Sequence, residues 1–242
     1  MRLLLSSGGN SSLSSKQKTI LNAQIEELFR GLDEVIFISY AQKNRIRYTT
    51  KVREKSWPLK NIKLIGIEEY DDPYDAIKNA KGIYVGGGNS FLLTHELYEN
   101  KLIKILNDVI KSGIPYMGVS AGTNIACPTM MTTNDMPIIM PEKLDTLNLV
   151  NFQINPHYHE GPVWLKNEEG YVEHNGETRA QRINEYHQNN IIPVIGLFEG
   201  SLIKWQNQKG KLMIGDAVIF HKGKIPKKIK NGTYLNNNLE II

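Results

Sequence analysis

The sequence holds a single cysteine, Cys127, among its 242 residues. One thiol cannot form an internal disulfide, and it cannot supply the several thiolates of a closed zinc site. Apolar runs are short throughout, and the three leucines that follow Arg2 are too few for the apolar region of a secretory signal peptide. We therefore expect a cytoplasmic protein with no membrane partner, no disulfide framework and no metal centre.

Charge of one sign is also scarce, because the formal net charge is only +4. The lysines are spread along the chain except for a cluster between residues 222 and 230, which is typical of a solvated surface. No RNP-like, zinc-finger or helix-turn-helix pattern accompanies that cluster. We therefore expect no nucleic-acid partner.

The sequence does contain a regular alternation of short apolar runs with longer amphipathic segments in its first half. Hydrophobic residues make up 40% of the chain, and its length suits one α/β domain over residues 1–242 better than two small ones. The alternation predicts a three-layer α/β fold, a mostly parallel sheet with helices on both faces. The expected strands are 2–6, 34–40, 62–67, 82–85 and 115–119, and the expected helices are 14–32, 44–57, 72–79, 90–99 and 102–112. Runs at 194–198, 202–205 and 217–220 are expected to finish this sheet as antiparallel strands.

A G-x-S-x-G pattern, Gly118-Val119-Ser120-Ala121-Gly122, stands at the end of the fifth expected strand. A serine that points its hydroxyl out of a sharp strand-to-helix turn has a strained backbone, and side chains two positions to either side would collide with the strand or helix. The alternative is a tight turn without chemistry. The strand before the pattern and the helix-like segment after it favour a nucleophile elbow with Ser120 as the nucleophile.

The glycine run Gly86-Gly87-Gly88 follows the fourth expected strand and precedes a helix. It matches neither the P-loop pattern nor G-x-G-x-x-G, which disfavours a bound nucleotide, and we expect no cofactor. Bare backbone N–H groups beside a second strand end suit an oxyanion hole better. A tight turn is again the alternative.

A serine nucleophile needs a base, and His157 is the best placed of the six histidines. It follows the apolar run 149–154 and is preceded by Pro156, which would hold it at a strand end. A histidine merely packed at a strand end is an equal alternative on this evidence. His157 and His159 could also form a metal patch, but the pair lacks a third ligand of matching placement.

Two carboxylates could orient this histidine. Asp135 lies in Thr132-Thr133-Asn134-Asp135-Met136-Pro137, between the serine and the histidine in the sequence. Glu199 lies at the end of the apolar run 194–198 and is followed by a glycine. The periodicity of the sequence does not choose between them, and a solvated loop carboxylate is the alternative for each.

Six ordered segments of the chain resemble the peptidase E family of α-aspartyl dipeptidases. They are Gly86-Gly87-Gly88-Asn89-Ser90, Gly118-Val119-Ser120-Ala121-Gly122, Ala126-Cys127-Pro128-Thr129, Thr132-Thr133-Asn134-Asp135-Met136-Pro137-Ile138, Gln153-Ile154-Asn155-Pro156-His157 and Gly176-Glu177-Thr178-Arg179-Ala180-Gln181-Arg182-Ile183. The resemblance runs from the first strand to about residue 200. It implies a fold like that of class I glutamine amidotransferases, which is flavodoxin-like, with serine in place of their cysteine. It also implies hydrolysis of dipeptides that carry an N-terminal aspartate.

The resemblance assigns roles to single residues. Ser120 falls on the family's nucleophile, His157 on its base and Asp135 on the charge-relay acid, while Glu199 falls on a glutamate proposed as the alternative third member. We favour Asp135 and keep Glu199 open. The amides of Gly88 and Ala121 fall on the oxyanion hole.

A substrate aspartate would need a cation, for which a guanidinium is best suited. Arg179 and Arg182 lie in the last resembling segment and are the candidates, although arginines on a helix surface are commonly only solvated. The expected partner is a small peptide substrate, and a homodimer is allowed.

Two departures from the family pattern concern the substrate. The family commonly has tryptophan where this chain has Val119, and the segment 158–174 is longer than usual. The aspartyl preference is therefore less secure than the serine and histidine. The alternatives are a cyanophycinase-like hydrolase of β-aspartyl peptides and a catalytically silent small-molecule-binding module on the same fold. A glutamine amidotransferase is disfavoured because the elbow holds serine and not cysteine. Cys127 lies seven positions beyond the serine and is better explained as a small core residue.

Overall fold

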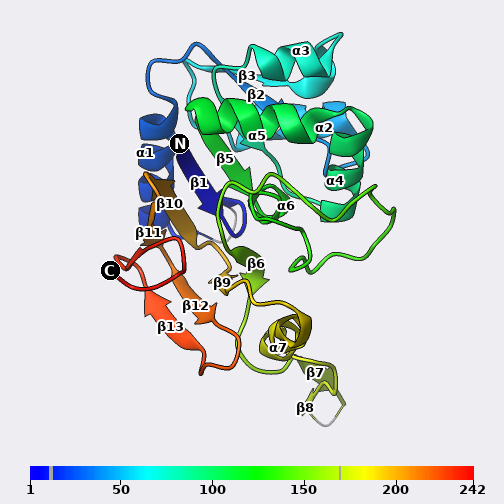
Figure 1. Ribbon diagram of the computed structural model, residues 1–242, viewed down its shortest axis with the longest axis vertical. Coiled ribbons are helices and arrows are strands. Elements are labelled where there is room, and N and C mark those ends of the chain that lie inside the picture. The colour runs from blue at the N-terminus through cyan, green and yellow to red at the C-terminus, as the bar shows by residue number, and fades with distance from the viewer. Residues whose placement is uncertain (11–12, 169) are drawn as a thin grey trace.

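The computed structural model describes residues 1–10, 13–168 and 170–242. Its main sheet has eight strands in the order β14-β11-β10-β1-β5-β4-β2-β3 (Figure 1). The neighbours from β1 to β3 pair in parallel, whereas β10, β11 and β14 extend the sheet with antiparallel pairs. The bounds of these strands are Arg2–Ser6 (β1), Glu34–Ile38 (β2), Lys63–Gly66 (β3), Ile83–Val85 (β4), Tyr116–Val119 (β5), Leu202–Gln206 (β10), Lys209–Ile214 (β11) and Tyr234–Leu235 (β14). The predicted mostly parallel sheet is confirmed.

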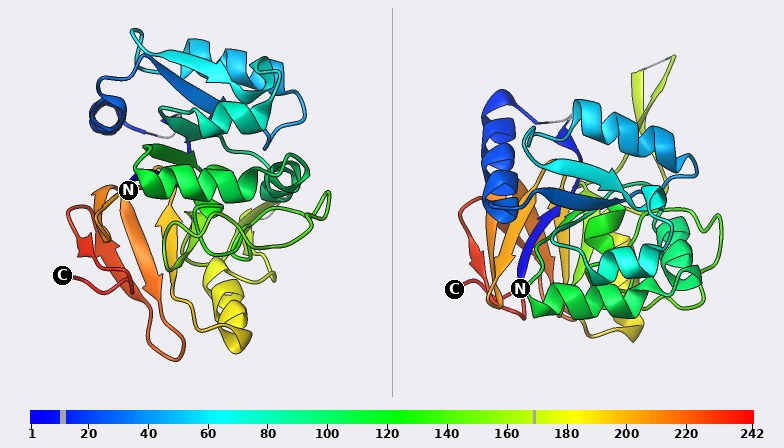
Figure 2. Two further views of the ribbon diagram at one scale, coloured as in Figure 1. Left: turned by 45° about the horizontal axis from the view of Figure 1, so that its top comes forward. Right: turned by 90° about the horizontal axis from the view of Figure 1, so that it is seen from above.

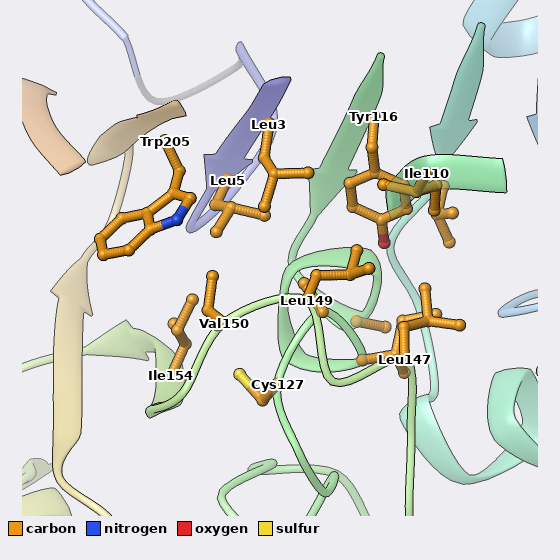
Figure 3. Close-up of a cluster of buried hydrophobic side chains, with 14 of the residues drawn as sticks. Leu3, Leu5, Ile110, Tyr116, Cys127, Leu147, Leu149, Val150, Ile154 and Trp205 are labelled. Atoms are coloured by element: carbon orange, nitrogen blue, oxygen red, sulfur yellow. The ribbon is translucent and has the colours of Figure 1, made fainter. Parts of the chain in front are cut away.

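Alternate residues of the central strands enter two different cores, one on each face of the sheet. Leu4 and Phe37 pack with the helices α1 (Ser15–Phe29) and α2 (Arg45–Lys55) on one face. Leu3 and Tyr116 face the opposite core, as Figure 3 shows for the cluster around Trp205. The helices on that face are α3 (Pro73–Lys78), α4 (Ser90–Glu99), α5 (Leu102–Ser112) and the short α6 (Ala121–Asn124), and a 3-10 turn, η2 (Ile67–Glu69), precedes them. The layers are visible in Figure 2.

A second sheet of four strands has the order β13-β12-β9-β6, with bounds Gln153–Tyr158 (β6), Val194–Phe198 (β9), Asp216–Phe220 (β12) and Lys227–Lys230 (β13). One face continues the core of the main sheet through Ile154 and Ile195. The other face is covered by α7 (Arg179–Asn189), whose Ile183 packs against Val194 and Phe220. The expectation that the late strands all finish one sheet is therefore wrong for 194–198 and 217–220, because β9 pairs with β6 and β12, and β12 pairs with β9 and β13, in the second sheet.

The expected helices and strands of the first half are all present, with ends that differ by a few residues. Helix starts follow side-chain caps that the sequence carries, such as Ser14 with Gln17 at α1 and Thr178 with Gln181 at α7. The hairpin β7 (Trp164–Asn167) and β8 (Gly170–Glu173) was not expected, and it projects beyond α7 (Figure 1). Across the described residues, none of the helices has the length and apolar character needed to cross a bilayer.

Candidate active site

Ser120 occupies a strained turn between β5 and α6, as the G-x-S-x-G pattern predicts. Its φ and ψ are 54° and −108°, values in which a non-glycine residue is rarely found. The two glycines of the pattern are required by close packing: a Cβ on Gly118 would overlap the Gly122 carbonyl, and a Cβ on Gly122 would overlap the Val85 carbonyl. The Ser120 N–H donates to Ser6 O at 2.9 Å, which ties the turn to the end of β1. The serine hydroxyl is therefore held at the carboxyl ends of the parallel strands, where such folds place ligands.

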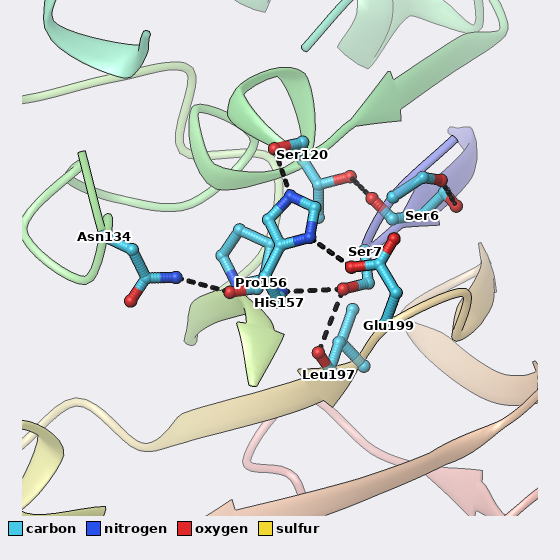
Figure 4. A network of polar contacts seen from close by, with 10 residues as sticks. Ser6, Ser7, Ser120, Asn134, Pro156, His157, Leu197 and Glu199 are labelled. Carbon is cyan, nitrogen blue, oxygen red and sulfur yellow. Dashed lines mark hydrogen bonds and ion pairs between the residues drawn. The ribbon is translucent and has the colours of Figure 1, made fainter. Parts of the chain in front are cut away.

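His157 comes from the second sheet and reaches this serine. The pairing of β6 with β9 shifts register between Asn155 and Tyr158, and His157 takes a positive φ of 54° at this irregularity. The bulge turns its imidazole toward the main sheet, and Nε2 lies 2.8 Å from Ser120 Oγ (Figure 4). The His157 N–H donates to Ser7 Oγ at 2.8 Å, and Ser7 in turn donates to Leu197 O at 3.0 Å. The histidine backbone is thus fixed to both sheets.

The second imidazole nitrogen, Nδ1 of His157, contacts Oε2 of Glu199. Glu199 follows β9, which runs parallel to β6, so the two side chains leave the same end of neighbouring strands. Gly8 makes room for this carboxylate, since a Cβ at that position would overlap Glu199 Oε1. A carboxylate on Nδ1 favours the tautomer that carries its proton there, which leaves Nε2 free to accept the proton of the serine.

Asp135 does not contact His157 among the described residues, whereas the resemblance favours Asp135 as the residue that orients this histidine. Its Oδ2 accepts from Ser90 N and from Ser90 Oγ, each at 2.7 Å, and from Thr133 Oγ1 at 3.1 Å. Asp135 therefore fixes its own loop to the first residue of α4. The physical reason is that a carboxylate satisfies the free N–H groups and the positive end of a helix N-terminus.

The loop that Asp135 fixes also supports the histidine strand. Asn134 Nδ2 donates to Pro156 O at 2.6 Å (Figure 4). Asn155 Nδ2 donates to Asn134 Oδ1 at 2.7 Å. Thr132 Oγ1 donates to Ile154 O at 2.8 Å. The contribution of this loop to the site is thus to hold the backbone on which His157 stands.

The amides of Gly88 and Ala121 are the two expected oxyanion donors. Among the described residues, no protein oxygen accepts a hydrogen bond from either of them. Gly88 has a φ of 141°, and a Cβ there would overlap the carbonyl of Ala41, so this turn of the loop needs glycine. A Cβ on the preceding Gly87 would lie 3.1 Å from the Cβ of Ser120, which places the glycine loop against the serine.

The two candidate arginines differ in their surroundings. Arg182 is exposed and its Nε lies 3.6 Å from Glu177 Oε2. Arg179 is half-buried, and its Nε is buried with no hydrogen-bond partner among the described residues. Burial lowers the pKa of the Arg179 guanidinium, the charge of Arg182 lowers it further and the charge of Asp135 raises it. An arginine remains charged even so, and an unpartnered buried N–H calls for an anion or acceptor.

The remaining chemically interesting residues lie apart from the serine. Cys127 is fully buried in the main core, and burial raises the pKa of its thiol, as expected for a core residue (Figure 3). No group of three or more histidine, cysteine, aspartate or glutamate side chains within the described ranges is arranged to hold a metal ion. His159 is not drawn into such a group with His157 among these residues.

Sequence reasoning missed Ser7 and Gly8, which support the histidine and the glutamate. Both stand directly after β1, at the carboxyl end of a central parallel strand. That position is a general signal for residues that line a site in this class of fold. Their position after a strand could therefore be seen in the sequence. Their partners, His157 and Glu199, could not, because those residues come from the second sheet.

The fold and the site together define an α/β protein with a serine, a histidine and a glutamate aligned at the carboxyl ends of its parallel strands. The sequence profile of peptidase family S51 matches residues 3–213. Peptidase E of Streptomyces coelicolor is 39% identical over 85% of this chain and 82% of its own. The Drosophila melanogaster protein named "Probable alpha-aspartyl dipeptidase" is 39% identical over 80% of this chain and 78% of its own. The chain therefore belongs to peptidase family S51.

A solved structure supports the fold independently. The crystal structure of a peptidase from an acI-B1 Actinobacterium has a TM-score of 0.65 and 16% sequence identity, and the match covers 97% of this chain and 96% of that one. At that identity the likeness concerns the fold alone. The expected α/β fold with helices on both faces of the sheet is confirmed.

Proposed function

We propose that this chain is a serine-type dipeptidase that hydrolyses dipeptides with an N-terminal aspartate, and that Ser120, His157 and Glu199 carry the reaction. The observation that carries the proposal is the continuous line of contacts from Ser120 Oγ through the imidazole to the Glu199 carboxylate. Membership of family S51 and the names of the relatives support the reaction type and the aspartyl substrate.

In this mechanism His157 Nε2 takes the proton of Ser120 as Oγ attacks the carbonyl carbon of the peptide. Glu199 holds Nδ1–H and stabilises the imidazolium that forms. The amides of Gly88 and Ala121 donate to the oxyanion of the tetrahedral intermediate. Collapse of that intermediate breaks the peptide C–N bond, and His157 returns its proton to the leaving amine. A water molecule, deprotonated by His157, then hydrolyses the aspartyl ester on Ser120.

Asp135 has a positioning role in this proposal. It fixes the loop whose Asn134 holds the carbonyl of Pro156, directly before the histidine. It also lies close enough to Arg179 to raise the pKa of that guanidinium. Asp135 therefore helps to place the base, without a contact to the imidazole among the described residues, and its charge favours the charged form of Arg179.

Arg179 is the group that would receive the side-chain carboxylate of the substrate aspartate. Its half-buried guanidinium and unpartnered Nε fit this role better than the solvated Arg182, which already pairs with Glu177. Truncating one member of a buried charge pair costs roughly 2 kcal/mol or more, which is about 30-fold. We expect Arg179→Met to lower kcat/KM for Asp-Leu by at least that factor.

The matched control for this prediction is Arg182→Met, which should change kcat/KM for Asp-Leu by less than about threefold because an exposed ion pair contributes little. The measurement also includes Ala-Leu, for which Arg179→Met should lose little. Equal losses in both arginine variants, or an equal loss for Ala-Leu, would contradict the assignment of Arg179.

The substrate class is tested by steady-state hydrolysis of Asp-X, Glu-X, Ala-X and isoAsp-X dipeptides with the wild-type protein. Asp-X should have the highest kcat/KM. A preference for isoAsp-X would indicate a cyanophycinase-like hydrolase of β-aspartyl peptides. Specific binding without turnover of any of them would indicate a silent binding module.

Metal removal should leave the activity unchanged. The serine, histidine and glutamate supply the nucleophile, the base and the orienting carboxylate without a Lewis acid. Dialysis against a strong chelator, followed by an assay with Asp-Leu, tests this. A collapse of activity that zinc or manganese restores would revive a metal site at His157 and His159.

A further inference from the structure

A cavity of about 350 Å³ opens beside Ser120 and His157, and neither the serine chemistry nor Arg179 accounts for it. Its walls come from α1, α2, the segment after α2 and the strands β4 and β5, and they include Ile25, Trp57 and Tyr84. These three residues belong to the apolar core that α1 and α2 form on one face of the main sheet. The ring of Trp57 stacks on that of Tyr84 with centroids 6.1 Å apart. The lining therefore combines an aromatic and aliphatic wall with polar side chains such as Asn22 and Gln42, and the apolar wall suits an apolar side chain.

Arg179 is not among the described residues that line the cavity. Arg179 is the first residue of α7, which packs on the second sheet. The cavity lies instead on the face of the main sheet that α1 and α2 cover. A peptide whose carbonyl carbon rests at Ser120 would thus send one residue toward Arg179 and the other into the cavity.

The proton transfer to the leaving amine favours the cavity as the site of the leaving residue. His157 must return its proton to the leaving nitrogen, and both His157 and Ser120 line the cavity. Tyr48 also lines it, and its hydroxyl lies against the glycine loop that carries one oxyanion donor, since a Cβ on Gly86 would be 2.6 Å from that hydroxyl. The leaving residue would therefore lie between the base and the oxyanion loop.

Lys51 gives the cavity one cation. It lies on α2 and lines the cavity, and it forms no ion pair with any carboxylate in the described part of the chain. The leaving residue of a dipeptide carries a free α-carboxylate, whereas an internal residue of a longer peptide does not. A lone ammonium beside an apolar pocket suits a residue that is apolar in its side chain and anionic at its C-terminus.

We propose that this cavity is the subsite for the C-terminal residue of the substrate, that it takes an apolar or aromatic side chain, and that Lys51 pairs with the C-terminal carboxylate. The proposal rests on the proposed dipeptidase function and adds what the second residue must be. It also gives a physical reason why cleavage would be limited to dipeptides.

The first experiment compares Asp-Leu with Asp-Leu-amide, which differs only in lacking the C-terminal charge. We expect the wild-type protein to prefer the free dipeptide by roughly tenfold or more in kcat/KM, as a hydrogen bond between charged groups provides. Lys51→Met should remove this preference by lowering kcat/KM for Asp-Leu and leaving the amide unchanged. The matched control is Lys55→Met, one turn further along α2 and outside the cavity, which should keep the preference.

The second experiment tests the shape of the cavity. Ser56 lines it and is half-buried after the end of α2, so Ser56→Trp should fill part of the space with little effect on folding. We expect kcat/KM for Asp-Phe to fall by roughly tenfold while Asp-Gly is retained, and Ser56→Ala to change neither. Retained Asp-Gly hydrolysis shows that the variant is folded and active.

The outcomes separate the two levels of the proposal. The inference is overturned if the wild-type protein has the same kcat/KM for Asp-Leu and its amide, or if Lys51→Met lowers kcat/KM for both alike. In either case the cavity does not bind the C-terminal carboxylate, and the dipeptidase proposal still stands. The inference is also overturned if Ser56→Trp lowers kcat/KM for Asp-Gly and for Asp-Phe in the same proportion while the variant still binds both dipeptides like the wild type. Failure of the wild-type protein to hydrolyse any Asp-X dipeptide would overturn the proposed function itself.

Discussion

Replacing Ser120 with alanine is expected to lower kcat for Asp-Leu by about 10⁴-fold or more, because loss of a triad nucleophile leaves only binding and oxyanion stabilisation. The structure supports this expectation through the 2.8 Å separation of Ser120 Oγ and His157 Nε2. The strained φ of 54° also fits a residue held in place for its side chain. The measurement is single-turnover and steady-state hydrolysis with purified Ser120→Ala.

The fold of Ser120→Ala should survive, because the change removes one partly buried hydroxyl and leaves the backbone hydrogen bond of the turn in place. Its thermal midpoint should stay within a few degrees of the wild type, and it should still bind Asp-Leu. Ser112→Ala on the surface of α5 is the matched serine control and should keep full activity. If Ser120→Ala retained more than about a tenth of wild-type kcat, against the expected 10⁴-fold loss, the serine would not be the nucleophile.

The second large effect concerns the two carboxylates. Glu199→Gln is expected to lower kcat by about 10⁴-fold with KM little changed, since an amide on Nδ1 of His157 favours the wrong tautomer. Asp135→Asn should be much milder. It keeps an oxygen that can accept from Ser90 and Thr133, and its effect should appear in KM and in stability instead. The paired measurement is kcat and KM for Asp-Leu together with the thermal midpoint of both variants.

The reverse ranking would contradict this assignment. If Asp135→Asn crippled kcat and Glu199→Gln were nearly silent, the loop would have to move Asp135 to the imidazole when substrate binds. Glu199→Asp adds a finer control, because it keeps the charge but shortens the reach. We expect it to recover more activity than Glu199→Gln if the carboxylate itself orients the histidine.

The parallel part of the fold could be read from the sequence because each of its elements carries a local signal. The run Glu34–Ile38 is β-branched and aromatic, and the segment Leu102–Ser112 places apolar residues at helical spacing. The turn at Ser120 has its own signal, since its two glycines are required by contacts within the strand–turn–helix unit and with the adjacent β4. Such features depend on neighbours close in sequence or on a general rule of parallel sheets.

The division of the late strands into two sheets had no comparable signal. The runs at 194–198 and 202–205 are both short and apolar, yet β9 pairs with β6 while β10 pairs with β1. The sheet that a strand joins depends on the shape and the apolar faces of the elements around it in the folded protein. The exposed hairpin β7–β8 was missed for a related reason, because its strands are short and, within the described residues, pair with each other alone.

By itself the sequence determined the α/β class, the strained serine at a strand end and a short set of residues able to serve it. Only the tertiary structure decided which carboxylate meets His157. Asp135 and Glu199 are both polar residues beside apolar or turn-forming segments, and each is far from His157 in the sequence. Glu199 reaches the imidazole because β9 lies parallel to β6, whereas Asp135 is drawn to the N–H and hydroxyl of Ser90. Contacts between distant segments follow from how the sheets pack, and local patterns of residues do not encode that packing.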